Sequence, residues 1–198
     1  MSRVMAIDIE TGNSAADIGG WGNTHMWDIT CVTTWDGKEA RAYVDKPMSI
    51  DGVLVKSLRS LKYDLDQHFD EGGVLLGHNI ISFDLPALRD SMDIFIAKKF
   101  LDNKEARCID TSRIMNKYSN GFHVSLDNLA KCNLGTQKSA DGLTAVKWWA
   151  EGRYEEVVKY CVLDSQISYD VWEKGRVEKQ IEYYNEDENN FIKVDIEW

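Results

Sequence analysis

Two acidic residues, Asp8 and Glu10, close the first apolar stretch of the chain. In a β-strand, side chains two positions apart point the same way, so both carboxylates lie on one face. Met5, Ile7 and Ile9 then point the other way, into a core. Like charges side by side repel, and a hard divalent cation such as Mg²⁺, which prefers oxygen ligands, removes that conflict. The pair indicates a strand that holds a metal, with a solvent-facing acidic edge as the alternative.

A third acid, Asp84, follows the short apolar stretch Val74–Gly77, which is typical of a central parallel strand. Ligands of open α/β sheets gather beyond the carboxyl ends of parallel strands. Asp84 stands in that place, just before a helix that begins near Pro86. It is therefore a candidate ligand residue, and an aspartate that starts a helix is the alternative interpretation.

The fourth acid, Asp164, stands four residues after Tyr160 in a stretch with helical spacing. Residues four apart share one face of a helix, so the phenol and the carboxylate are neighbours. Taken alone, this pair is equally consistent with a tyrosine–aspartate hydrogen bond on a helix surface. The combination of all four acids is far more specific than any one pair.

Three patterns occur in order along the chain: D-x-E on a first strand, N-x-x-x-F-D after a G-H-N turn, and Y-x-x-x-D on a late helix. Together they resemble the DEDD superfamily of 3′–5′ exonucleases, which share the ribonuclease H-like fold. The tyrosine makes the chain similar to the DEDDy branch and to the proofreading domains of family A and B DNA polymerases. The sister branch has histidine where this chain has Lys159. The resemblance covers about residues 4–174.

The resemblance implies a two-metal mechanism with Mg²⁺ or Mn²⁺. The two ions would be held by four carboxylates, those of Asp8, Glu10, Asp84 and Asp164. The hydroxyl of Tyr160 would orient the attacking water. Nucleoside 5′-monophosphates would then be released from a free 3′ end.

The resemblance also implies substrate contacts. Phe83 would stack on a terminal base, and Asn79 would hydrogen-bond near it. Thr11 and Gly12 end the first strand beside the substrate, and Gly12 leaves the backbone room for a ligand to approach. Lys138, in an L-G-x-x-K segment that resembles family B proofreading domains, would contact phosphate.

Single-stranded DNA 3′ ends are the expected substrate, because the tyrosine branch looks like proofreading domains. An exoribonuclease on the same fold is one alternative, since the motifs do not show how the ribose 2′-OH is treated. A noncatalytic ribonuclease H-like module that binds a partner is the alternative from a different class. We expect a separate DNA polymerase or replication protein as a partner, and no membrane.

Composition supports one intracellular domain. At 198 residues we expect a single exonuclease domain, with a motif-bearing core at about 4–174 and a C-terminal extension at 175–198. The net charge of −10 argues against broad binding to long duplex DNA, but not against holding a short single-stranded end near metal. The cysteines are scattered and predict reduced thiols in a cytoplasmic protein: Cys31, Cys108, Cys132 and Cys161.

The elements that must position these residues follow in the order β-β-β-α-β-α-β and then helices. That order predicts an α/β layout with a five-stranded mixed sheet, its first three strands antiparallel, flanked by helices. The resemblance identifies this layout as ribonuclease H-like. Residues 13–23 are expected to form a flexible loop, and helical spacing is expected from Asp51 to Phe69. Later helices are expected near Pro86 and at 125–132, 143–151 and 153–174.

The last stretch, residues 191–198, alternates apolar and charged residues, which is a strand signal. An unpaired exposed strand promotes aggregation, so we expect this one to pair after crossing a polar connector. The edge of its own sheet is the favoured partner, and a second chain is the other option. A frayed terminus is the alternative interpretation.

Overall fold

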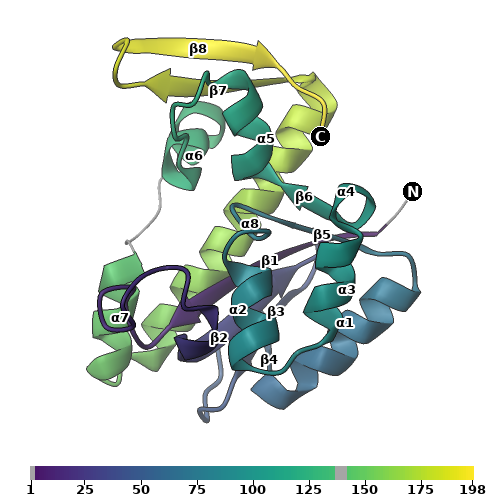
Figure 1. Ribbon diagram of the computed structural model, residues 1–198, viewed down its shortest axis with the longest axis vertical. Coiled ribbons are helices and arrows are strands. Elements are labelled where there is room, and N and C mark those ends of the chain that lie inside the picture. The colour runs from purple at the N-terminus through teal and green to yellow at the C-terminus, as the bar shows by residue number, and fades with distance from the viewer. Residues whose placement is uncertain (1–2, 137–141) are drawn as a thin grey trace.

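The computed structural model describes residues 3–136 and 142–198, and a six-stranded mixed sheet forms its centre (Figure 1). The strand order is β4-β3-β2-β1-β5-β6. Strands β1, β2 and β3 are antiparallel neighbours, while β5 runs parallel to β1 and β6 parallel to β5. The bounds are β1 (Val4–Thr11), β2 (Ile29–Trp35), β3 (Ala40–Val44), β4 (Val53–Lys56), β5 (Val74–Gly77) and β6 (Cys108–Asp110). This confirms the predicted α/β fold with its three antiparallel first strands.

The sixth strand corrects the prediction of five. Residues 53–56 were expected to open a helix, but they form β4, which pairs with β3 in parallel from Ala40↔Val53 to Tyr43↔Lys56. Val53 and Val55 are β-branched and pack on the apolar cluster beside β3, so pairing outweighs the helical spacing. The helix starts later, at Leu61, after a short 3₁₀ turn.

Helices cover both faces of the sheet (Figure 1). The buried side chains of α1, α2 and α3 pack on Met5, Ile7 and Ile9, which point away from the two acids of β1 as predicted. On the other face, α8 packs along β1 and β2. The helix bounds are α1 (Leu61–Asp70), α2 (Asp84–Ser91), α3 (Ile96–Asp102), α4 (Lys104–Arg107), α5 (Thr111–Tyr118), α6 (Leu126–Leu134), α7 (Gly142–Ala150) and α8 (Tyr154–Glu178).

The C-terminal residues form a separate two-stranded sheet, seen in yellow in Figure 1. Strand β8 (Asn190–Asp195) pairs with β7 (Gln180–Asn185), within the stretch that was expected to be a polar connector. The predicted strand is therefore confirmed over residues 191–195, while residues 196–198 lie beyond it, and the expected pairing with the edge of the main sheet was wrong. The connector forms a strand because its alternate residues Ile181 and Tyr183 are buried against α6 and α8.

Among the helices of the described residues, none combines the length and the apolar character needed to cross a membrane.

Candidate active site

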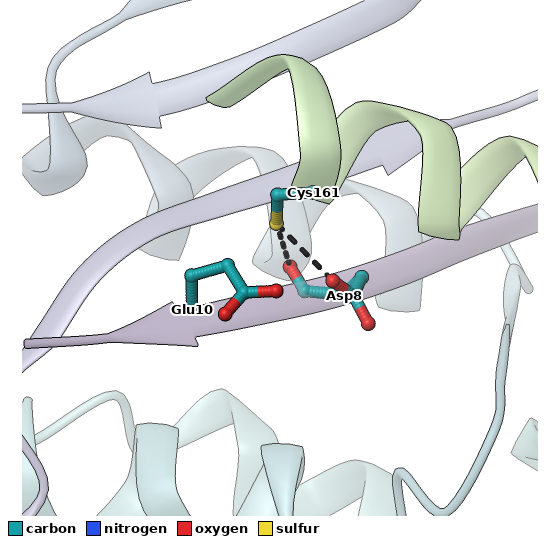
Figure 2. A group of neighbouring side chains, drawn as sticks. All are labelled: Asp8, Glu10 and Cys161. Atoms are coloured by element: carbon teal, nitrogen blue, oxygen red, sulfur yellow. Dashed lines mark hydrogen bonds between the residues drawn. The ribbon is translucent and has the colours of Figure 1, made fainter. Parts of the chain in front are cut away.

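Strand β1 carries Asp8 and Glu10 at the centre of the sheet, between β2 and β5. Their Cα partners on β2 are Thr33 and Cys31. Glu10 is buried and Asp8 is half-buried. Figure 2 shows both on β1 beside α8, the helix that carries Tyr160 and Asp164. The alternation of β1 thus aims both carboxylates at one helix, as its D-x-E spacing predicts.

Helix α8 brings Tyr160 and Asp164 to the same place, each with 2% of its surface exposed. They are one turn apart, and Tyr160 hydrogen-bonds to the Asp164 carboxylate. A cavity of about 490 Å³ lies beside them. Its polar wall is formed by Asp8, Glu10, Thr11, Asn13, Tyr160 and Asp164. Three of the four predicted acids therefore share one cavity with the predicted tyrosine.

Burial raises the pKa of Tyr160 far above its ordinary value, and the nearby carboxylates of Asp164, Glu10 and Asp8 raise it further. The phenol is therefore neutral at physiological pH and holds its proton firmly. In this state it can donate a hydrogen bond and orient a neighbouring molecule. It is a poor candidate for a general base.

Asp84 is the first residue of α2 and lies beside Asp8. It is 4% exposed and accepts a hydrogen bond from the backbone of Ile9. Burial raises its pKa well above the ordinary aspartate value, and the charge of Asp8 raises it further. Two carboxyls that repel in this way form a site that favours an added positive charge. The fourth acid thus joins the other three through its electrostatic interaction with Asp8.

A further residue, Cys161, lies against the acids and was not predicted as part of the site. Its Sγ atom is 3.2 Å from Asp8 Oδ2 and 3.5 Å from the Asp8 carbonyl oxygen (Figure 2). Candidate ligand atoms of Asp8, Glu10 and Cys161 all lie within 4.8 Å of one another. Burial raises the pKa of the Cys161 thiol well above its usual value, as does its hydrogen bond with Cys31. The thiol therefore keeps its proton and can donate a hydrogen bond.

The donor set fits a hard divalent cation. Carboxylate oxygens from Asp8, Glu10 and Asp164 face one cavity, and Asp84 adds a fourth carboxyl beside Asp8. Mg²⁺ and Mn²⁺ prefer such oxygen ligands, and a protonated thiol contributes little to their binding. The charge of Asp8 favours the protonated form of Asp84, and a bound cation would counteract this effect.

An aromatic group forms the opposite, apolar part of the cavity wall. Trp21, Trp27 and Phe83 all line it, with ring centroids 5.1 to 5.4 Å apart in tilted and edge-to-face contacts. Phe83 was predicted, but the two tryptophans were not. They come from the segment between β1 and β2, which the Asn13 side chain ties to Met26 and Asp28 through hydrogen bonds of 2.9 and 3.0 Å. These two hydrogen bonds connect the two ends of the segment that contains the expected flexible loop.

Two predicted substrate residues lie at the end of β1. Thr11 is buried, lines the cavity and donates to the Asn13 carbonyl oxygen at 2.8 Å. The backbone at Gly12 is approached closely by the chain itself, and the predicted approach of a ligand there stays a prediction. A Cβ atom there would stand 2.5 Å from the Asp28 carboxylate, so the glycine makes room for Asp28 and the adjoining segment.

Asn79 is exposed and has a left-handed backbone, with φ of 74°. Its N–H donates to the Asp110 carboxylate at 2.9 Å, and Ile81 donates to the same carboxylate at 3.0 Å. Asp110 therefore fixes the turn that leads to Phe83 and Asp84. Lys138, the predicted phosphate contact, lies outside the described residues.

One comparison with known proteins gives a match. A model described as the RNase H superfamily matches residues 7–188, which include all four acids, Tyr160 and the start of the C-terminal hairpin. Among curated proteins, none matches the chain significantly.

Proposed function

The chain belongs to the RNase H superfamily, and on that premise we propose that it is a metal-dependent 3′–5′ exonuclease acting on single-stranded DNA. Members of this superfamily generally hydrolyse phosphodiester bonds of nucleic acids. The single observation that carries the proposal is the meeting of Asp8, Glu10, Asp164 and Tyr160 in one cavity, with Asp84 beside Asp8. This set has the residue types and the order along the chain of the tyrosine branch of DEDD exonucleases.

Each acid has a distinct place in the proposed site. Asp8, Glu10 and Asp164 would hold one divalent ion, and Asp8 and Asp84 would hold a second. Two such ions, when bound, stabilise the charge that develops on the attacked phosphate and make water more acidic. The sheet and α8 contribute by fixing the carboxylates before substrate arrives.

Tyr160 would position the attacking water. Its phenol is neutral, 2% exposed and hydrogen-bonded to Asp164, so its oxygen is held at the cavity wall. A hydroxyl whose proton is donated to Asp164 can accept a hydrogen bond from a water and set its direction of approach. It need not remove a proton from that water, and its raised pKa disfavours that role.

The aromatic group would bind the terminal base. Phe83 and Trp21 line the same cavity as the carboxylates, and base–aromatic stacking tolerates any sequence. Stacking requires an unpaired base, which favours a single-stranded end over a closed duplex. The net charge of −10 is consistent with binding a short DNA end through base stacking and bound metal, without a broad basic surface.

A degradation assay tests this function. DNA and RNA strands of equal sequence are incubated with the protein in Mg²⁺, in Mn²⁺ and in excess chelator. We expect 5′-mononucleotides from single-stranded DNA with either metal and none with chelator. Faster release from RNA would replace the DNA assignment with an exoribonuclease. No release from either strand would contradict a catalytic role and favour a noncatalytic module.

The control is an exposed acid outside the cavity. Asp102→Asn removes a carboxylate on α3 that pairs with Lys98 on the surface. We expect this variant to degrade DNA at the wild-type rate, because surface ion pairs contribute little to stability.

A further inference from the structure

A row of buried polar groups connects β2, α8 and β1 beneath the carboxylates. The Thr33 hydroxyl on β2 donates to the Cys161 carbonyl oxygen at 2.9 Å and lies 3.3 Å from Cys161 Sγ. The same Sγ lies 3.2 Å from Asp8 Oδ2 on β1. Thr33 and Cys161 have no exposed surface. This row therefore joins the helix of Tyr160 and Asp164 to the strand of Asp8 and Glu10.

The direction of the thiol bond follows from the acceptors around it. A thiol has one proton, and Asp8 Oδ2 is nearer to Sγ than the Asp8 carbonyl oxygen at 3.5 Å or Thr33 Oγ1 at 3.3 Å. A carboxylate oxygen is also the stronger acceptor, because a charged partner strengthens a hydrogen bond. The Thr33 proton is already directed to the Cys161 carbonyl oxygen at 2.9 Å. Cys31, the other hydrogen-bond neighbour of the thiol, offers only a sulfur atom, which is a weaker acceptor than a carboxylate oxygen. The S–H group therefore points at Asp8.

We propose that Cys161 is a positioning residue that holds the Asp8 carboxylate in the orientation needed to bind metal. Asp8 is the acid shared by both proposed ions, so its orientation affects the whole site. Outer hydrogen bonds to metal ligands typically change metal affinity by about 10- to 100-fold. For catalysis the inference rests on the proposed function, but for metal binding it stands on the geometry of Cys161 and Asp8 alone.

Two substitutions separate positioning from packing. Cys161→Ala removes the donor, and Cys161→Ser keeps a donor of similar size. If the thiol served packing alone, serine would be the more harmful change, because it buries a hydroxyl in an apolar cluster. If it positions Asp8, alanine is the more harmful change for metal binding. The two roles thus predict opposite orders.

The readout is Mn²⁺ affinity, measured by titration calorimetry on the full chain, with melting temperature recorded for each variant. We expect Cys161→Ala to bind Mn²⁺ about tenfold more weakly than wild type. We expect Cys161→Ser to stay within about threefold of wild type, and kcat to follow the same order. Cys108→Ala is the control, since it removes a thiol that packs on the apolar cluster of the other sheet face and bonds the Phe100 carbonyl oxygen. It should leave Mn²⁺ affinity nearly unchanged.

Thr33→Val gives a second variant that keeps side-chain shape and removes the hydroxyl that anchors Cys161. It should weaken Mn²⁺ binding in the same direction, which keeps the proposal testable if Cys161→Ala does not fold. Wild-type Mn²⁺ affinity in Cys161→Ala or in Thr33→Val would overturn the proposal. Weaker Mn²⁺ binding by Cys161→Ser than by Cys161→Ala would also overturn it, as would the absence of Mn²⁺ binding by wild type. If wild type binds Mn²⁺ in the predicted order but cleaves nothing, the positioning role stands and the proposed function fails.

Discussion

Trp21 meets Phe83 edge to face, with ring centroids 5.4 Å apart and planes inclined at 78°. Trp21 is 68% exposed, although it also contacts the buried Trp27. An exposed tryptophan that lines the same cavity as the carboxylates is placed to meet an incoming base. The contact therefore links a segment next to β1 with the turn that carries Asp84.

Removing the Trp21 ring should weaken substrate binding more than it slows the chemistry. Base–aromatic stacking contributes about 1–3 kcal/mol, so Trp21→Ala should raise KM for single-stranded DNA by about tenfold. We expect kcat to change by less than about threefold, because the ring is not part of the proposed metal-binding set. Initial rates at varied strand concentration measure both constants.

Phe95→Ala is the control for that variant, because Phe95 is also a highly exposed aromatic residue but does not line the cavity. It should leave KM unchanged. An unchanged KM in Trp21→Ala would show that the tryptophan is not a substrate contact.

The grouping of Asp8 with Glu10, and of Tyr160 with Asp164, could be predicted because each pair lies within a single element. The period of a strand fixes the direction of Asp8 and Glu10, and one helical turn fixes Tyr160 beside Asp164. Cys161 could not be predicted, because its place depends on which face of α8 meets β1. No local spacing marks that contact.

The fold likewise has features that local spacing predicts and features that depend on contacts between distant segments. Residues 53–56 alternate weakly and continue into a helical pattern, so the local signal did not reveal a strand that depends on pairing with β3. Strand β7 was hidden by its acidic surroundings, although Ile181 and Tyr183 alternate correctly. Trp21 and Trp27 sit in a Gly-rich segment, whose path is fixed by the distant contacts of Asn13.

Replacing the hydroxyl of Tyr160 should separate water positioning from metal binding. Tyr160→Phe keeps the ring and loses the hydrogen bond with Asp164. We expect kcat to fall by about 10²-fold, because orientation of the nucleophile is lost. Mn²⁺ affinity should fall by at most about tenfold, because the phenol is not a proposed ligand and its loss removes one hydrogen bond to the ligand Asp164. A large loss of Mn²⁺ affinity in a titration would contradict this division of roles.

The buried His68 predicts a pH dependence of stability away from the site. Its Nε2 lies 3.1 Å from the Val74 carbonyl oxygen, and burial lowers its pKa below the ordinary 6.5. The unfolded chain therefore takes up a proton at higher pH than the folded chain. The contribution of neutral His68 to stability is present above pH 6.5 and declines as pH falls toward its lowered pKa.

Unfolding in urea at several pH values between about 5 and 8 measures this decline. His68→Gln cannot titrate, so its free energy of unfolding should fall less steeply with acid than that of wild type. His123→Gln, at an exposed position, should follow the wild-type curve. Parallel curves for wild type and His68→Gln would contradict the assignment.

The C-terminal hairpin should contribute to stability. Ile196 is buried, and the Asn133 side chain bonds both the N–H and the carbonyl oxygen of Glu182, at 2.9 and 2.7 Å. Ile196→Ala should lower the free energy of unfolding by about 2–5 kcal/mol, as expected for a buried isoleucine. Lys193→Ala, on the exposed side of β8, should change it by less than about 0.5 kcal/mol. Chemical denaturation compares the two, and equal effects would show that the hairpin is not docked.

The direction of degradation tests the central claim most directly. Single-stranded DNA labelled at the 3′ end or at the 5′ end is incubated with Mg²⁺ and wild type, Asp8→Ala or Asp164→Ala. With wild type, we predict that the 3′ label appears at once as a mononucleotide, while the 5′-labelled strand shortens step by step. Either substitution should lower kcat by about 10³-fold or more while the melting temperature is maintained. Shortening from the 5′ end, internal cuts, or wild-type turnover by Asp8→Ala would contradict the account.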